Sequence, residues 1–128
     1  MIVGVGIDLV DIERVERMIA DRGERATHKL FTEREAQYAL SRAHPARHFA
    51  ARFAAKEAAY KALAGNALAR GIGWRDLEVL RDAESGQPSL ELHGRAAERA
   101  AELGVTRVML SLTHSHATAA AVVVLEGA

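Results

Sequence analysis

The pattern of apolar and polar positions predicts an alternation of strands and helices. The chain opens with an apolar run over residues 1–9, rich in β-branched side chains, which indicates a buried strand. A very apolar run over 117–126 closes the chain, and we expect it to be a strand buried on both faces. In full, the pattern favours strands over 1–9, 76–81, 89–93, 106–113 and 117–126, and helices over 12–20, 32–42, 47–63 and 94–103.

Boundary residues support several of these elements. Asp11 is a natural N-cap for the first helix, and Thr32 with Glu35 resembles the capping box that opens a second helix. A turn over 84–88 joins its two flanking strands into a hairpin. The order strand, helices, hairpin, helix, hairpin predicts a single α+β domain over residues 1–128, with a mostly antiparallel sheet packed against the long helix.

Composition narrows the possible classes of function. Lys plus Arg equals Asp plus Glu at 17 each, so no global basic charge favours nucleic acid and any charged partner must meet a local patch. The chain has no Cys, which excludes disulfides and thiolate metal sites. The apolar N-terminus is too short for a signal peptide and no run is long enough to span a membrane, so we expect a cytoplasmic location.

The long helix carries the most informative polar residues. It sets one carboxylate, Glu57, among the basic residues Arg52, Lys56 and Lys61, and such a helix can hold a cation and phosphate oxygens together. Asp8 stands at the end of the first apolar run. Two carboxylates on rigid elements suit Mg²⁺, which takes few protein ligands and fills its shell with water and phosphate oxygens. Asp8 and Glu57 are therefore the expected metal site.

The same residues also have plainer interpretations. Asp8 could be an exposed carboxylate at a strand end, and Glu57 with Lys61 has the i,i+4 spacing of a common surface ion pair. His114 and His116 form an H-x-H that could bind Zn²⁺ with Asp8 as a third ligand, or simply belong to a polar corner between two strands.

Glycines mark places where backbone can come close to another group. Gly4 and Gly6 in the first strand indicate the approach of another backbone or of a ligand. Gly65, Gly71 and Gly73 indicate a loop over 64–74 that could bring backbone N–H groups to phosphate, although it matches no dinucleotide or Walker pattern.

The first helix mixes basic and acidic residues, as a solvated helix would. Its functional interpretation is a docking face for an acidic helix, formed by Arg14, Arg22 and Arg25 together with the apolar Met18.

Three blocks of the chain resemble the signatures of the phosphopantetheinyl transferases. Gly-Val-Gly-Ile-Asp-Leu-Val at 4–10 resembles the first, and Phe-Ala-Ala-Lys-Glu-Ala-Ala-Tyr-Lys-Ala at 53–62 resembles the second at the right separation. Ser-Leu-Thr-His-Ser at 111–115, followed by Ala-Ala-Ala-Val-Val at 119–123, resembles the third. The resemblance covers essentially the whole chain, and the short length points to the small single-domain type with its phosphopantetheinyl transferase-like fold.

The resemblance implies a reaction and its components. Enzymes of this type transfer the 4′-phosphopantetheine arm of coenzyme A to a serine of apo acyl carrier protein, in fatty-acid biosynthesis, and release adenosine 3′,5′-bisphosphate. The resemblance also implies Mg²⁺ and a homotrimer in which neighbouring subunits share active sites.

The resemblance also assigns roles to individual residues. Asp8 and Glu57 match the metal-binding carboxylates and, with Lys61 near the pyrophosphate, the catalytic residues. The matched coenzyme A-binding positions are Arg47, Arg52, Lys61 and His114. The matched or neighbouring carrier-protein positions are Arg14, Met18, Arg22, Arg25 and Phe53. The base that takes the serine proton is either Glu57 or a water on the metal.

Two other functions remain open from the residues. One is a Zn²⁺- or Mg²⁺-dependent hydrolase of a coenzyme or nucleotide pyrophosphate, using Asp8, His114 and His116. The other is a non-catalytic module that binds an acidic helical partner through the first helix.

Overall fold

The computed structural model describes residues 1–64 and 67–128. In chain order its elements are β1 (Ile2–Asp11), α1 (Ile12–Arg22), α2 (Glu24–Leu30), α3 (Glu33–Leu40), α4 (Pro45–Ala62), η1 (Ala67–Ala69), η2 (Trp74–Asp76), β2 (Leu77–Arg81), β3 (Pro88–Leu92), α5 (Gly94–Glu102), β4 (Val105–His114) and β5 (Thr118–Gly127). The predicted α+β class and the hairpin of β2 and β3 are confirmed.

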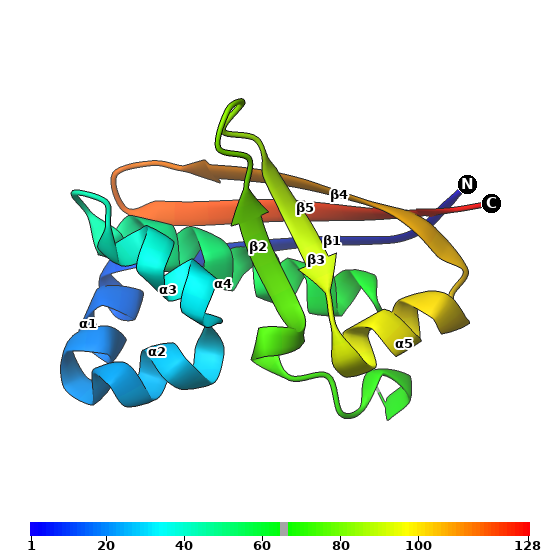
Figure 1. Cartoon of the computed structure of the whole chain (residues 1–128), viewed down its shortest axis with the longest axis horizontal. Helices are drawn as coiled ribbons and strands as arrows, with labels where there is room; N and C mark the ends of the chain where they lie inside the picture. Colours follow the sequence, from blue (N-terminus) through cyan, green and yellow to red (C-terminus); the bar gives the residue numbers. More distant parts are fainter. Residues whose placement is uncertain (65–66) are drawn as a thin grey trace.

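The main sheet has the order β1-β5-β4, and both strand pairs are antiparallel (Figure 1). Asp8 of β1 is paired with Ala121 of β5, which is paired in turn with Leu112 of β4. The long helix α4 packs against this sheet, while β2 and β3 form a separate two-stranded sheet. The predicted antiparallel sheet beside a long helix is therefore correct.

The contact between α4 and β1 is unusually close because both surfaces carry small residues. A Cβ on Gly6 would lie 1.8 Å from the carbonyl oxygen of Ala58, and one on Gly4 would lie 2.2 Å from that of Ala62. The predicted close approach of backbone at these glycines is confirmed, and the group that approaches is the helix backbone.

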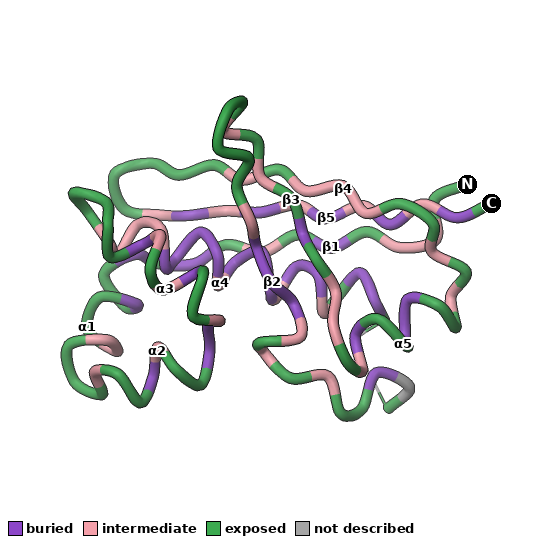
Figure 2. Tube along the Cα trace, in the orientation of Figure 1, coloured by how far each residue is buried: buried purple, intermediate pink, exposed green. Residues whose placement is uncertain are grey.

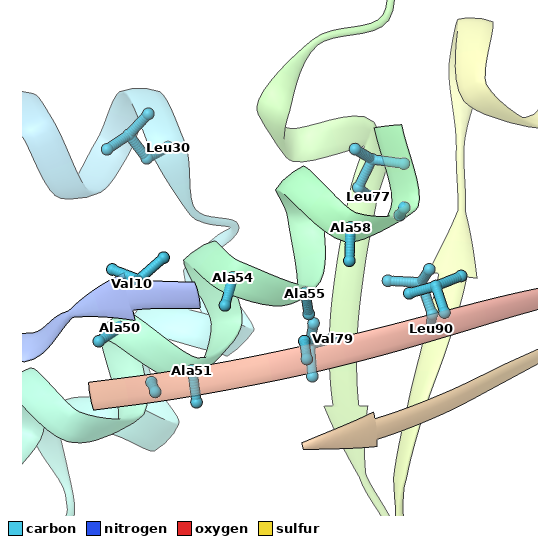
Figure 3. Packing of buried hydrophobic residues seen from close by; sticks show 14 of the residues in the cluster. Val10, Leu30, Ala50, Ala51, Ala54, Ala55, Ala58, Leu77, Val79 and Leu90 are labelled. Carbon is cyan, nitrogen blue, oxygen red and sulfur yellow. The ribbon is translucent and has the colours of Figure 1, made fainter. Parts of the chain in front are cut away.

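Alanines form much of the core. Figure 3 shows alanines of α4 pointing toward the neighbouring strands, with Val79 and Leu90 of the small sheet close by. The α4 alanines in the core cluster are Ala50, Ala51, Ala54, Ala55, Ala58, Ala59 and Ala62. Small side chains let the helix lie near the sheet, which brings polar groups on neighbouring faces of the two elements within reach of each other.

Capping residues in the sequence correctly predicted where α1 and α3 begin. Asp11 caps α1 by accepting a hydrogen bond from the Glu13 backbone N–H, and Thr32 with Glu35 forms the complete capping box of α3. The helix α2 was not predicted, because Gly23 suggested only an end. Gly23 has φ 58° and closes α1, and α2 begins at the next residue.

The loop over 64–74 differs from its prediction. It contains η1, and the Gly73 N–H already donates to Asp76 Oδ2 at 3.0 Å, so that group is not free for phosphate. Gly65 lies outside the described residues.

One face of the main sheet is apolar and open to solvent. Val5, Ile7 and Leu9 are 57%, 64% and 69% exposed, and they alternate with the β1 residues that face α4. Along β5 burial also alternates, between buried and intermediate (Figure 2). The prediction that 117–126 is buried on both faces is thus wrong for the single chain, which fully buries only one. No helix within the described residues is long and apolar enough to cross a membrane.

Candidate functional site

Asp8, Glu57 and Lys61 come together where α4 crosses β1. The Lys61 Nζ donates to Asp8 Oδ1 at 3.0 Å and to the Ile7 carbonyl oxygen at 3.1 Å. Glu57 lies close enough to Asp8 for the negative charge of Asp8 to act on it. The three residues expected to be catalytic are therefore neighbours, and the contact spans 49 positions of sequence between the two carboxylates.

The charges of Asp8 and Glu57 favour the binding of a cation beside them. Burial and then the negative charge of Asp8 raise the pKa of Glu57, while the positive charges of Lys61 and Arg14 oppose the rise. A carboxylate whose ionisation is opposed by burial and by a neighbouring carboxylate gains from a cation placed beside it. The Asp8 side chain is 14% exposed, so the pair is sheltered yet open to solvent.

The backbone explains why these side chains meet. Gly4, Gly6 and Asp8 lie at alternate positions of β1 and so share the face toward α4. Glu57 immediately precedes Ala58, whose carbonyl oxygen lies against Gly6. Any larger residue at Gly6 would push the helix away from the strand and separate Glu57 from Asp8.

Lys56 does not belong to this group. Its Nζ donates to Glu35 Oε1 at 2.7 Å, to the Trp74 carbonyl oxygen at 3.0 Å and to the Leu77 carbonyl oxygen at 2.5 Å. Its side chain is fully buried. The interpretation of α4 as a helix that offers Lys56 to phosphate is therefore wrong, because one residue step turns the side chain about 100° from that of Glu57.

Arg52 is held in a different cluster of positive charge, which we call the Tyr38 cluster: Tyr38, Arg42, His48, Arg52 and Arg81. The guanidinium carbons of Arg52, Arg81 and Arg42 lie 4.4, 5.6 and 5.7 Å from the centre of the Tyr38 ring. The His48 ring meets the same ring edge-on, and Arg81 donates to the Tyr38 hydroxyl.

The Tyr38 cluster has the character of an anion site. Arg52 is 4% exposed, and its Nε has no hydrogen-bond partner among the described residues. Burial and then the charges of Arg52, Arg42 and His114 lower the pKa of His48. Arg52 and His114, both expected to bind coenzyme A, are thus near one another but belong to a different group from Lys61.

Arg47, the remaining expected coenzyme A residue, lies elsewhere. It lines a hollow of about 650 Å³ between the start of α1, the start of α4 and the corner between β4 and β5. His116 lines the same hollow, together with the acidic residues Asp11, Glu13 and Glu16.

The expected carrier-protein residues extend along α1 and beyond. Arg14 is exposed and influences Glu57 by its charge, and Met18 packs partly against the core. Arg22 and Arg25 line a hollow of about 470 Å³, at the α1–α2 turn, with Lys29. Lys29 was not predicted, because the helix that carries it was missed.

Phe53 lies on α4 and is partly buried. Its ring lies 5.2 Å from that of Trp74, centre to centre. It precedes Glu57 by four residues, so both side chains lie on the same side of the helix.

A second polar cluster lies around Glu78 of β2. Ligand atoms of Glu78, Glu91 and His93 lie within 4.8 Å of one another, and this is the one such group among residues 1–64 and 67–128. Arg34 and Thr32 already donate to Glu78, with Arg34 Nη2 2.6 Å from Oε1. The cluster is a satisfied ion-pair network, and the three Zn²⁺ ligands considered above, Asp8, His114 and His116, do not form such a group.

Comparison with known proteins identifies the family. The family model described as "4'-phosphopantetheinyl transferase superfamily" matches residues 4–122. A holo-[acyl-carrier-protein] synthase of Geobacter metallireducens is 45% identical over 126 residues, which are 98% of each chain.

Solved structures give the same result. The acyl carrier protein synthase of Mycobacterium tuberculosis superposes with a TM-score of 0.78 at 42% identity, over 100% of both chains. The holo-(acyl-carrier-protein) synthase of Bacillus anthracis, solved in complex with CoA (3',5'-ADP), has a TM-score of 0.80 at 33% identity, over 100% of this chain and 99% of that one. With this similarity along its whole length, the chain belongs to the holo-[acyl-carrier-protein] synthases of the 4′-phosphopantetheinyl transferase superfamily.

Proposed function

We propose that this chain transfers the 4′-phosphopantetheine arm of coenzyme A to a serine hydroxyl of an apo acyl carrier protein, in fatty-acid biosynthesis. The observation that carries the proposal is the meeting of Asp8, Glu57 and Lys61 in a chain similar over its whole length to holo-[acyl-carrier-protein] synthases. In this reaction the serine oxygen bonds to the phosphorus that bears the pantetheine arm. The bond from that phosphorus to the bridging oxygen breaks, and adenosine 3′,5′-bisphosphate leaves.

Asp8 and Glu57 would hold Mg²⁺. Oxygen ligands are those that Mg²⁺ prefers, and a carboxylate pair in which one pKa is raised by the other is a fitting place for it. When bound, the ion would neutralise charge on the pyrophosphate and orient it for attack.

Side chains of the protein would neutralise the charge on the leaving group and help to remove the serine proton. Lys61, already 3.0 Å from Asp8, would neutralise the charge that grows on the departing phosphate oxygen. The serine proton needs an acceptor, and either Glu57 or a water held on the Mg²⁺ would take it. Phosphoryl transfer depends mainly on such positioning and charge neutralisation.

The coenzyme A residues fall into two groups, and the family resemblance implies an active site shared between subunits. Lys61 lies with the carboxylates, whereas Arg52 and His114 lie around the Tyr38 cluster. We infer that the pyrophosphate of coenzyme A binds at Asp8, Glu57 and Lys61 of one subunit. Its 3′-phosphate would bind the Tyr38 cluster or the Arg47 hollow of a neighbour.

The uncovered apolar face of the main sheet supports association in a homotrimer. Val5, Ile7 and Leu9 would be withdrawn from water there, and burying such side chains contributes about 1.5–3 kcal/mol each. We expect a trimer in light scattering, and Ile7→Lys should dissociate it and lower activity. A monomeric wild-type chain with full activity would contradict the shared site.

Acyl carrier protein would dock along α1. Arg14, Arg22 and Arg25 are exposed and Lys29 adds to them, so an otherwise neutral chain presents a local basic face to an acidic partner. Met18 and Phe53 would supply apolar contact beside it. A cytoplasmic location, where such a carrier would be met, remains part of this proposal.

Chromatography of the nucleotide product tests the reaction class. Incubation with coenzyme A and Mg²⁺ should release adenosine 3′,5′-bisphosphate only when an apo acyl carrier protein is present. Release without carrier protein would favour the pyrophosphate hydrolase. Binding of carrier protein with no release under any condition would favour the non-catalytic module.

A further inference from the structure

The buried pair of Lys56 and Glu35 has a strongly directional set of hydrogen bonds. Lys56 uses three donors, on Glu35 and on the carbonyl oxygens of Trp74 and Leu77. The Glu35 carboxylate also accepts from the backbone N–H groups of Thr32 at 2.8 Å and Val79 at 2.8 Å. Both side chains are 0% exposed, so each depends on the other and on these backbone groups for its polar contacts.

This network joins four elements at one point. Glu35 belongs to α3 and Lys56 to α4, while the accepted and donated backbone bonds reach η2 and β2. The opposite side of α4 touches β1 through Gly6 and Ala58. The helix is therefore held on one side by backbone contact and on the other by the Lys56 network.

Apart from Phe49 near its start, whose ring lies 4.8 Å from that of Phe31, the apolar side chains that α4 fully buries are alanines. Small side chains interlock less with their neighbours than large ones do, so the Lys56 network is the main polar restraint on the middle of the helix. Rotation of a helix by about 20° moves a side-chain tip by on the order of 2 Å, given a helix diameter of 10–12 Å. Such a movement at Glu57 would break its alignment with Asp8.

We propose that Lys56 and Glu35 are positioning residues, whose buried network fixes the rotation of α4 and so holds Glu57 beside Asp8. The inference rests on the proposed function, since it concerns the pair of carboxylates assigned to Mg²⁺. Lys56 directly precedes Glu57 in α4. The hydrogen bonds that fix the direction of the Lys56 side chain therefore also fix the direction in which Glu57 leaves the helix. Neither Lys56 nor Glu35 would touch substrate, since both side chains are fully buried.

The test uses Lys56→Met/Glu35→Gln, which removes both buried charges together and leaves neither unpaired. Mg²⁺ binding is measured by calorimetry, and kcat and the KM for carrier protein by initial rates, well below the unfolding temperature. We expect Mg²⁺ affinity to fall about tenfold and kcat to fall about 10- to 100-fold, as small misplacements of reacting groups do. The KM for carrier protein should change less than about twofold, since the basic face on α1 is untouched.

Leu103→Ala is the matched control. Leu103 follows α5 and packs partly against the core, and its backbone N–H donates to Arg99 and not to the Lys56 network, so its loss should lower the unfolding temperature alone. Wild-type Mg²⁺ affinity and kcat in the folded double variant would overturn the inference, as would an equal loss of both in Leu103→Ala. If the double variant does not fold, Glu35→Asp, which keeps both charges but shortens the acceptor side chain by one methylene, decides by the same two readouts. A wild-type chain that neither binds Mg²⁺ nor transfers the arm would instead overturn the proposed function.

Discussion

Gly6 of β1 lies so near Ala58 of α4 that a Cβ on the glycine would sit 1.8 Å from the alanine's carbonyl oxygen. The neighbouring residue in the helix, Glu57, and the residue two positions along the strand, Asp8, are the carboxylates that meet. The absence of one side chain on the strand thus decides whether the two halves of the site can touch.

Gly6→Ala should therefore damage stability and activity together. The new methyl group must push backbone away from backbone, at a cost of about 3 kcal/mol or more in the free energy of unfolding. Gly73→Ala is a suitable control, because its Cβ would meet nothing closer than 3.8 Å. Chemical denaturation and initial rates check both variants. Wild-type stability and rate in Gly6→Ala would show that β1 and α4 need not lie this close.

Asp8→Asn and Glu57→Gln should each lower kcat by on the order of a hundredfold to a thousandfold, because each removes charge from the proposed Mg²⁺ site. The fold should persist, since both side chains lie at its surface or are only partly buried. Circular dichroism and initial rates give the two readouts, with the exposed Glu98→Gln as a control that keeps full activity. Near-normal turnover in either folded variant would refute the assignment of the two carboxylates.

Arg22→Glu and Arg14→Glu should raise the KM for acyl carrier protein about tenfold while the KM for coenzyme A changes less than about twofold, since a reversed charge repels an acidic partner. Arg14 also influences Glu57, so Arg22 is the cleaner variant. Arg75→Glu, an exposed arginine on η2, serves as the control for net charge. Equal changes in the two KM values would argue against a docking face on α1.

Acid should destabilise the protein partly through Glu78. Burial acts to raise the pKa of Glu78, but hydrogen bonds from Arg34, Thr32 and His93 outweigh it and lower the pKa to about 2. A folded-state pKa below the unfolded value of about 4.5 gives stabilisation that is complete above about pH 4.5 and lost as pH falls toward 2. The shift corresponds to at most about 3 kcal/mol of unfolding free energy.

Urea denaturation at pH 7, 4 and 3 measures this loss. Glu78→Gln should lack that part of the acid dependence, whereas Glu91→Gln, a half-exposed neighbour, should keep it. An unchanged acid dependence in Glu78→Gln would show that other carboxylates account for the loss.

The features of this fold that depend on neighbouring residues could be predicted from the sequence. The cap at Asp11 and the capping box of Thr32 and Glu35 depend on residues no more than three positions apart, and both are present. The helix α2 was missed because a glycine at the end of one helix and at the start of the next looks the same in sequence. The acidic residue in its first turn and the basic residues in its last were the available signals.

Long-range contacts could be predicted only in part. The meeting of Asp8 and Glu57 followed from the family resemblance, since no local rule joins positions 49 apart, although Gly4 and Gly6 were a sign that another group comes close to the strand. The burial of Lys56 could not be foreseen, because its partner Glu35 was already explained as part of a cap. The role of Glu35 in the capping box is evident from the sequence, and its second role as the partner of Lys56 is not.

The transfer reaction itself is tested by the intact mass of an apo acyl carrier protein after incubation with this protein, coenzyme A and Mg²⁺. We expect a gain of one phosphopantetheine group, abolished by a chelator and by Glu57→Gln. No gain with several carrier proteins, from folded protein that binds coenzyme A, would contradict it.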